Sequence, residues 1–284
     1  MAAPANHNRR PRPGTYVTAS IDLSSDLALI GAAAEKAASI AMGYFQNSPG
    51  TWFKGEERSP VSEADIAVDT YLREHLLAAR PGYGWLSEET EDDADRLGRD
   101  TLFVVDPIDG TRAYIAGEIN WCVSVAVVSK GRAVAGVLAA PARREVWLAS
   151  SDGGAWLNGE RLPARPTRTP DIQLLVSMPD RIAHQALTIG DGQIVRAPGG
   201  PSLALRLARV ASGELGAVFV RPQAKEWDIA AADVMLAETG HLVVDDAGEP
   251  VRYNRADPSH GLLIAAAPGE LPLLQRMFPS DGGH

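Results

Sequence analysis

The chain has 284 residues, of which 45% are hydrophobic, so it can form one large domain or two moderate ones with a substantial core. Its formal net charge of −9 makes nucleic-acid polymers and anionic membranes poor partners, and a small anionic ligand would need a cation to receive it. No apolar run reaches the ~18 residues of a transmembrane helix. The single cysteine, Cys122, excludes an internal disulfide, favours a reducing, cytoplasmic compartment, and lies in a predicted strand as a packing residue.

The N-terminal region is predicted to begin with a tail and a helix. Residues 1–18 contain basic side chains but no apolar stretch after them, which indicates a disordered tail rather than a signal peptide. Residues 24–45 are rich in alanine, with apolar residues at helical spacing. Ser24 or Ser25 can cap this helix, because serine side chains accept hydrogen bonds from the first-turn amides.

A second helix is predicted over residues 62–82. Ser62 is expected at its N-cap, and Asp65 follows three residues later, close to the pattern of a capping box. The proline and glycine at 81–82 end the helix. A short strand and an acidic loop follow over 84–100, before an apolar strand that starts at Phe103.

The remainder of the chain shows two different patterns. Short apolar runs with glycine-containing turns over 121–162 predict an antiparallel β meander. Strands and helices then alternate over 173–278, which predicts a second, α/β unit. The change of pattern near 163–171 divides the chain into an N-terminal α+β domain, residues 19–165, and a C-terminal α/β domain, residues 166–284.

Acidic side chains recur where predicted strands end and helices begin. Each has an ordinary structural explanation, because aspartate at a helix N-cap is favoured by about 1 kcal/mol over alanine, and glutamates can begin a solvated loop. These positions are Asp65 in the second helix, Glu88 and Glu89 after the short strand, Asp106 and Asp109 after the longer strand, and Asp228 at the predicted N-cap of a later helix.

Residues 106–111, with the sequence DPIDGT, are harder to explain as a turn alone. Pro107 fixes its own φ and holds Asp106 extended, so this elbow can aim the carboxylates of Asp106 and Asp109 and the Ile108 carbonyl at one centre. Such oxygen atoms are ligands of hard divalent ions such as Mg²⁺, and without a cation the carboxylates would repel one another. The glycine and threonine that follow can offer backbone N–H groups to an anion. This combination suggests phosphate chemistry, in which two ions about 4 Å apart activate water and stabilise the leaving oxygen.

Four segments together resemble the inositol monophosphatase superfamily of metal-dependent, lithium-sensitive phosphatases. They are FKGEERSPVSEADIAVD (53–69), WLSEET (85–90), DPIDGT followed by an aromatic residue (106–114) and EWDIAAADVMLAETG (226–240), and they occur in the family's order. The resemblance implies a layered αβαβα sandwich of the inositol monophosphatase and fructose-1,6-bisphosphatase type, with the site between an α+β half and an α/β half. Family members often dimerise, so a homodimer is among the expectations.

The resemblance also implies a set of metal ligands. Glu88, Asp106 and the carbonyl of Ile108 would bind a first Mg²⁺ ion. Asp106, Asp109 and Asp228 would bind a second ion, so the family pattern implies two to three ions in all.

Further roles follow from the same resemblance. Glu88, with Asp65 acting through water, would support a weaker third ion. Thr111 would orient the attacking water and would itself be positioned by Asp65. Gly110 and Thr111 would offer N–H groups to the phosphate, and Lys54 would lie in an outer shell near the metals.

The segment before the Trp–Asp pair bears on the substrate. Inositol-specific members usually carry an acidic residue there, whereas this chain has Arg221 and Lys225, which suit a second phosphate. Ser202 lies in a segment that resembles the serine-bearing segment of bisphosphate nucleotidases, Arg112 adds a cation, and Asp228 would also contact the substrate. We therefore expect 3′(2′),5′-bisphosphate nucleotidase activity, which converts 3′-phosphoadenosine 5′-phosphate to AMP and phosphate.

Two alternatives stay open. Inositol-1-monophosphatase or broad sugar-phosphate phosphatase activity follows if Arg221 and Lys225 are ordinary surface charges. A non-catalytic sensor of a phosphorylated ligand is a third reading, although every carboxylate of the family's metal site is present. The histidines show no metal-ligand spacing, and His184 and His260 are expected to be surface or loop residues.

Overall fold

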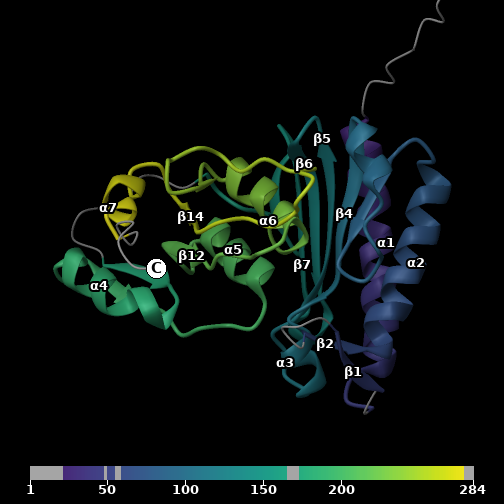
Figure 1. Cartoon of the computed structure of the whole chain (residues 1–284), viewed down its shortest axis with the longest axis horizontal. Helices are drawn as coiled ribbons and strands as arrows, with labels where there is room; N and C mark the ends of the chain where they lie inside the picture. Colours follow the sequence, from purple (N-terminus) through teal and green to yellow (C-terminus); the bar gives the residue numbers. More distant parts are fainter. Residues whose placement is uncertain (1–21, 48–49, 55–58, 165–172, 278–284) are drawn as a thin grey trace, which may run out of the picture.

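The computed structural model describes residues 22–47, 50–54, 59–164 and 173–277, and it stacks them as helix, sheet, helix, sheet and helix (Figure 1). One outer layer holds α1 (Leu23–Tyr44) and α2 (Glu63–Ala79), and the middle layer holds α5 (Leu203–Ser212) and α6 (Glu226–Glu238). The other outer layer holds α4 (Asp180–Gly190) and α7 (Leu271–Gln275). The predicted αβαβα sandwich is confirmed.

The first sheet has seven strands in the order β3-β4-β5-β6-β7-β8-β9. Consecutive strands from β4 to β9 pair antiparallel, as predicted for the meander, while β3 runs parallel to β4. Its strands are β3 (Gly84–Ser87), β4 (Thr101–Asp109), β5 (Cys122–Ser129), β6 (Arg132–Ala140), β7 (Glu145–Ser150), β8 (Gly154–Leu157) and β9 (Glu160–Arg161). The short elements around it are the hairpin β1 (Thr51–Lys54) and β2 (Ser59–Ser62), the helix α3 (Thr111–Ile115), and the 3₁₀ helices η1 (Ala94–Gly98) and η2 (Pro141–Arg143).

The second sheet has five strands in the order β11-β10-β12-β14-β13. Strand β10 runs parallel to β11 and β12, whereas β14 runs antiparallel to β12 and β13. Its strands are β10 (Leu174–Ser177), β11 (Ile194–Arg196), β12 (Ala217–Val220), β13 (Leu242–Val244) and β14 (Leu263–Ala266). The predicted α/β alternation is therefore present, but α4 and β11 were not predicted, although Ile182, Ala183 and Ala186 are buried at helical spacing.

Alternating apolar residues bury both faces of β4. Leu102 and Val104 belong to the core on the side of α6, whereas Phe103 and Val105 belong to the core on the side of α2. A strand that is buried on both faces has apolar side chains at consecutive positions, which explains the sequence FVV at residues 103–105. Cys122 is fully buried in β5, so its predicted packing role is confirmed.

Two helix starts differ from the prediction. Helix α1 begins after Asp22 and not after Ser24 or Ser25, because the Asp22 carboxylate accepts the Ser25 N–H at 3.2 Å. Helix α6 begins after Lys225, so Asp228 is its third residue and not its N-cap. The Asp228 carboxylate accepts the Lys225 N–H at 2.8 Å, so a side chain inside the helix satisfies the backbone N–H of the N-cap residue.

Two predictions fall where the structure describes little. The predicted disordered tail, residues 1–18, lies outside the described residues. Residues 165–171 of the predicted boundary segment also lie outside them, so the division into two domains stays a prediction. Among the described helices, none combines the length and the apolar character that a bilayer-spanning segment needs.

Candidate active site

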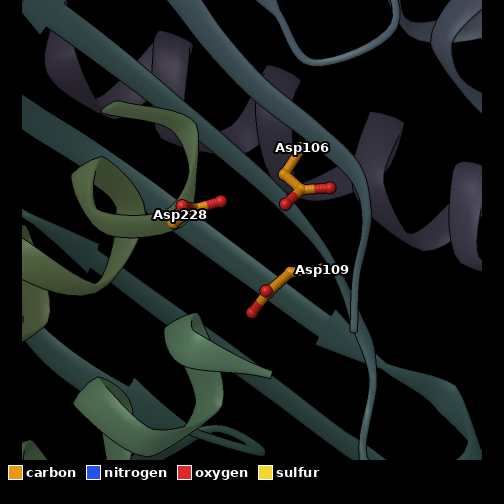
Figure 2. A group of neighbouring side chains, drawn as sticks. All are labelled: Asp106, Asp109 and Asp228. Atoms are coloured by element: carbon orange, nitrogen blue, oxygen red, sulfur yellow. The ribbon is translucent and has the colours of Figure 1, made fainter. Parts of the chain in front are cut away.

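Three carboxylates from two distant segments meet beside the end of β4. Asp106 and Asp109 end this strand, and Asp228 comes from the first turn of α6 (Figure 2). Each of the three offers an oxygen atom that lies within 4.8 Å of those of the other two. They meet because α6 packs across the first sheet and brings its first turn to this strand end.

The predicted elbow is a sharp turn stabilised by local hydrogen bonds. The Ile108 N–H donates to Asp106 Oδ1 at 3.0 Å, and the Thr111 hydroxyl donates to the Ile108 carbonyl at 3.0 Å. Gly110 adopts a left-handed conformation with φ of 96°, and a Cβ atom at this position would lie 3.0 Å from the Asn120 carbonyl oxygen. Glycine is therefore required here by both conformation and space.

The Asp109 carboxylate is held at the N-terminus of α5. It accepts hydrogen bonds from the Ser202 hydroxyl at 2.5 Å, from the Leu203 N–H at 3.2 Å and from the Ala204 N–H at 2.7 Å. Ser202 is only 2% exposed, and its hydroxyl also caps α5 by accepting the Leu205 N–H at 3.1 Å. The structure thus directs Ser202, which was predicted to bind substrate, toward Asp109 and the helix end.

Burial dominates the electrostatics of this cluster. Burial raises the pKa of Asp106 well above its usual range, and the nearby carboxylates of Glu88, Asp109 and Asp228 raise it further. Burial and the adjacent Asp109 raise the pKa of Asp228 in the same way. Burial also raises the pKa of Asp109, although its hydrogen bonds from α5 oppose the shift. Converging buried carboxylates are the oxygen donor set that Mg²⁺ takes, and its charge would relieve their repulsion.

Two further acidic residues lie close to this cluster. Asp65 is 1% exposed, and its carboxylate accepts the N–H and the hydroxyl of Ser62 at 2.8 and 2.6 Å, so the predicted capping box is confirmed. The Thr111 hydroxyl approaches the other Asp65 oxygen at 3.4 Å, and burial raises the pKa of Asp65 to about 6. Glu88 lies just after β3 and lines the same cavity as the cluster. The side chain of Lys54, which was predicted to be near the metals, is not among those described.

A cavity of about 630 Å³ opens above the carboxylates. Its lining carries two groups of opposite charge: Glu88, Asp106, Asp109 and Asp228 are acidic, whereas Arg206 and Arg221 are cationic. We call these the acidic wall and the cationic wall. Arg112 lines the cavity as well, as do Gly110 and Thr111 of the turn.

Arg206 is a lining residue that the sequence analysis missed. Its Nη1 donates to the Ser177 hydroxyl at 3.2 Å, while its buried Nε has no hydrogen-bond partner among the described residues. Burial lowers the pKa of this arginine, and the nearby Arg221 acts in the same direction. The sequence contained a signal for Arg206. It lies one turn after the Ser202 cap, on a helix whose other inward-facing residues are apolar.

Lys225 is placed differently from expectation, whereas the two histidines expected in loops or at the surface are found there. Lys225 is not among the cavity-lining residues, and its ammonium group donates to the Ser259 hydroxyl at 2.6 Å. His260 lies in a loop as expected, but it is buried rather than at the surface, whereas His184 is exposed. Burial and the adjacent Arg255 lower the pKa of His260 to about 4, so this side chain is neutral at pH 7.

Comparison with known proteins gives consistent results. An inositol-1-monophosphatase from Rhizobium meliloti is 32% identical over 197 residues, which cover 66% of this chain and 73% of that protein. The solved structure of the extragenic suppressor protein SuhB from Bartonella henselae superposes with a TM-score of 0.76 at 25% identity and covers 91% of this chain and 100% of that one. CysQ from Bacteroides thetaiotaomicron superposes with a TM-score of 0.69 at 25% identity, covering 87% and 98% of the two chains.

The profile of the inositol monophosphatase family matches residues 22–277, which include both walls of the cavity. Enzymes of this family depend in general on Mg²⁺, in agreement with the donor set of the acidic wall. The chain therefore belongs to the inositol monophosphatase family, a family of phosphoric monoester hydrolases.

Proposed function

We propose that this protein is a Mg²⁺-dependent phosphomonoesterase whose substrate carries a second anionic group, and that it acts as a 3′(2′),5′-bisphosphate nucleotidase. The observation that carries the proposal is the pair of oppositely charged walls around one cavity. One phosphate would lie against the acidic wall together with its cations, and the second against the cationic wall.

On the acidic side, the chain supplies ligands and orientation. Asp106, Asp109, Asp228 and Glu88 would hold two to three Mg²⁺ ions, which when bound supply positive charge to the phosphate and activate water. The Thr111 hydroxyl lies between the Ile108 carbonyl and Asp65, and this supports a role in orienting the attacking water. Gly110 and Thr111 of the adjoining turn line the cavity, and their backbone N–H groups would contact the phosphate.

On the cationic side, two arginines support recognition of a second phosphate. Arg221 is exposed at the cavity, and Arg206 projects from α5 with an Nε that is free of partners among the described residues. A guanidinium group matches phosphate oxygens in pairs, and a partly desolvated one binds them more strongly than one in bulk water. The family resemblance places Arg221 where inositol-specific members usually carry an acid, so the exchange of charge favours a substrate with more negative charge.

Inositol-1-monophosphatase activity is the second candidate. It is supported by the relative from Rhizobium meliloti, which bears that name and is 32% identical to this chain. Neutral ring hydroxyls, however, would leave the cationic wall without an anionic partner, and an unpaired, partly buried guanidinium is unfavourable.

The test is release of inorganic phosphate from a substrate panel with Mg²⁺ and with EDTA. The panel contains 3′-phosphoadenosine 5′-phosphate, inositol 1-phosphate and fructose 1,6-bisphosphate. We expect Mg²⁺-dependent release in every active case, with the largest kcat/KM for the nucleotide. A preference for inositol 1-phosphate would replace the nucleotidase proposal by the second candidate. Absence of release from all three with Mg²⁺ would reject the phosphatase proposal.

A further inference from the structure

The loop that carries Glu88 is anchored at its near end by a buried carboxylate of α2. Asp69 accepts hydrogen bonds from the hydroxyls of Ser87 and Thr90, the latter at 2.5 Å. The Trp85 indole N–H donates to Thr90 Oγ1 at 3.2 Å. The residues on both sides of Glu88 are therefore fixed to the first helical layer.

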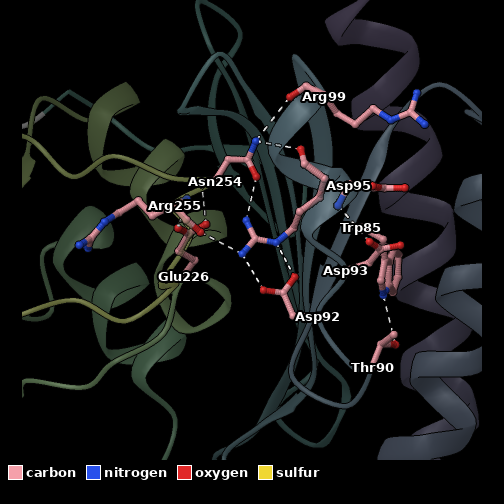
Figure 3. Close-up of polar contacts among 10 residues, drawn as sticks. Trp85, Thr90, Asp92, Asp93, Asp95, Arg99, Glu226, Asn254 and Arg255 are labelled. Atoms are coloured by element: carbon pink, nitrogen blue, oxygen red, sulfur yellow. Dashed lines mark hydrogen bonds and ion pairs between the residues drawn. The ribbon is translucent and has the colours of Figure 1, made fainter.

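The far end of the same loop is anchored by Arg96 of η1, which is only 3% exposed. Its Nε and Nη2 donate to the Asp92 carboxylate at 2.6 and 2.8 Å. Its Nη1 donates to Asn254 Oδ1 at 2.8 Å, and its Nη2 to the Arg255 carbonyl at 2.9 Å (Figure 3). A Cβ atom at Gly84 would lie 3.2 Å from the Arg96 Cβ, so η1 packs directly on β3. A guanidinium group with this many fixed acceptors has little freedom to move.

The segment that receives Arg96 is in turn fixed to α6. Glu226 is fully buried, and its carboxylate accepts the N–H groups of Asn254 at 2.7 Å and Arg255 at 2.9 Å (Figure 3). Glu226 lies in the first turn of α6, two residues before Asp228. A continuous series of hydrogen bonds thus runs from the Glu88 loop, through Arg96 and residues 254–255, to the helix turn that carries Asp228.

This connection matters because Glu88 follows a strand and Asp228 lies in a helix. No strand pairing links these two elements directly, so other contacts must fix their relative position. Metal–oxygen distances in a protein site vary by only a few tenths of an ångström, and Asp106 is the expected shared ligand of the ions held by Glu88 and by Asp228, so the relative position of these carboxylates affects the affinity for the cations. We propose that Arg96, Asn254 and Glu226 form a positioning cluster that fixes the Glu88 loop relative to the turn of Asp228 and thereby sets the affinity of the site for divalent cations. The inference rests on the metal-dependent function proposed above.

The test compares Arg96→Met with Arg99→Met in the full chain. Arg99 follows in the same loop, and its guanidinium group points away from the cluster (Figure 3), so its loss serves as the matched control. Binding of Mg²⁺ to the metal-free protein is measured by isothermal titration calorimetry, and the Mg²⁺ dependence of phosphate release is measured in parallel. We expect Arg96→Met to raise the Kd for Mg²⁺ about 10-fold or more, with kcat at saturating Mg²⁺ much less affected. Arg96→Lys, which keeps the charge but not the forked geometry, should lie between the two.

The outcomes separate this inference from the proposed function. If the unaltered protein binds no Mg²⁺, the proposed function fails. If it binds Mg²⁺ and Arg96→Met binds with the same Kd, the positioning cluster is rejected, even if that variant melts at a lower temperature. Should Arg96→Met fail to fold, Asn254→Gly takes its place, because it removes one acceptor of Arg96 while glycine tolerates the φ of 60° at this position. An unchanged Kd in Asn254→Gly would equally reject the inference.

Discussion

The two walls of the cavity are built in different ways. On the acidic wall, Asp106 and Asp109 are buried and bonded to backbone N–H groups of their own turn and of α5. On the cationic wall, Arg221 is exposed on a loop, and Arg206 reaches the cavity by its long side chain. The carboxylates are thus positioned by the fold itself, whereas the guanidinium groups depend on side-chain conformation.

This difference suggests that the acidic wall controls turnover and that the cationic wall controls which substrate is preferred. Repelling carboxylates in a buried site must be held by the backbone, because otherwise they would move apart or take up protons. Arg221, an exposed cation on a loop, can be exchanged without disturbing the sheet below. We therefore expect changes on the acidic wall to abolish turnover and changes on the cationic wall to alter only which ester is preferred.

The largest effect is expected from Asp106→Asn and Asp228→Asn. Each should lower Mg²⁺-dependent kcat/KM by more than about 10³-fold, or ~4 kcal/mol of transition-state stabilisation. Both variants should keep their fold in EDTA, because each removes a buried charge that is repelled by its neighbours. Phosphate release and circular dichroism measure the two properties. Asp100→Asn, an exposed carboxylate just before β4, is the control and should retain full activity. Near-normal turnover in either site variant would remove that carboxylate from the metal site.

A smaller effect is expected from Thr111→Ala, which tests the turn between the two walls. Loss of the hydroxyl should lower kcat by about 10²-fold and leave KM within about 3-fold, because positioning of the water acts on the chemical step. Thr111→Ser keeps the hydroxyl and should retain most of the activity. Steady-state kinetics at saturating Mg²⁺ measures both constants. A change confined to KM would show that Thr111 contributes to binding and not to the chemical step.

Arg221→Glu tests the cationic wall directly. It should lower kcat/KM for 3′-phosphoadenosine 5′-phosphate by about 10- to 100-fold, since one charge-assisted contact to phosphate is lost and a repulsive charge is added. For inositol 1-phosphate the change should be less than about 3-fold. Arg206→Gln should act in the same direction, and Arg132→Glu, an exposed arginine at the start of β6, should change neither substrate. An equal loss for both substrates would argue against a separate wall for selectivity.

The smallest effect concerns stability as a function of pH. Burial raises the pKa of Asp65 from 3.8 to about 6, and it raises those of Asp106 and Asp228 as well. A carboxyl group with a raised pKa binds its proton more tightly in the folded state than in the unfolded state. Its contribution to the free energy of unfolding is therefore complete below the pKa of the unfolded state, and it is lost as pH rises through the pKa of the folded state. In EDTA, Tm should therefore fall by a few degrees between pH 5 and pH 7. Saturating Mg²⁺ should abolish or reverse this trend in differential scanning fluorimetry. An identical pH dependence in EDTA and Mg²⁺ would contradict a cation site within the acidic wall.

Much of the acidic wall, and of the neighbouring Asp65, could be predicted because the sequence signals are local. Ser62 and Asp65 are three residues apart and form the capping box that their spacing indicates. The elbow around Pro107 follows from residues that are adjacent in the chain. Asp228 was recognised as a site residue, but its place in α6 was wrong by three positions, because a carboxylate at the third helical residue can cap the helix from within.

The parts that escaped prediction depend on contacts between distant residues. Arg206 was missed, and Ser202 was interpreted as a substrate contact although its hydroxyl is bonded to Asp109. Arg96 and Asn254, which are 158 residues apart, form a hydrogen bond that no spacing rule could indicate. Lys225 looked like a cation for the substrate, yet its ammonium group donates to Ser259.

By itself, the sequence determined most of the helices and strands, the Ser62–Asp65 cap and the turn that carries Asp106 and Asp109, because hydrophobic period and turn chemistry act over a few neighbouring residues. The order of layers and the set of candidate metal ligands followed from the resemblance to the family. Only the tertiary structure decided which side chains line the cavity and which form hydrogen bonds to other groups of the protein instead. The physical reason is that a hydrogen bond or a charge contact acts over a few ångströms in space, and the packing of α5 and α6 between the two sheets sets those distances.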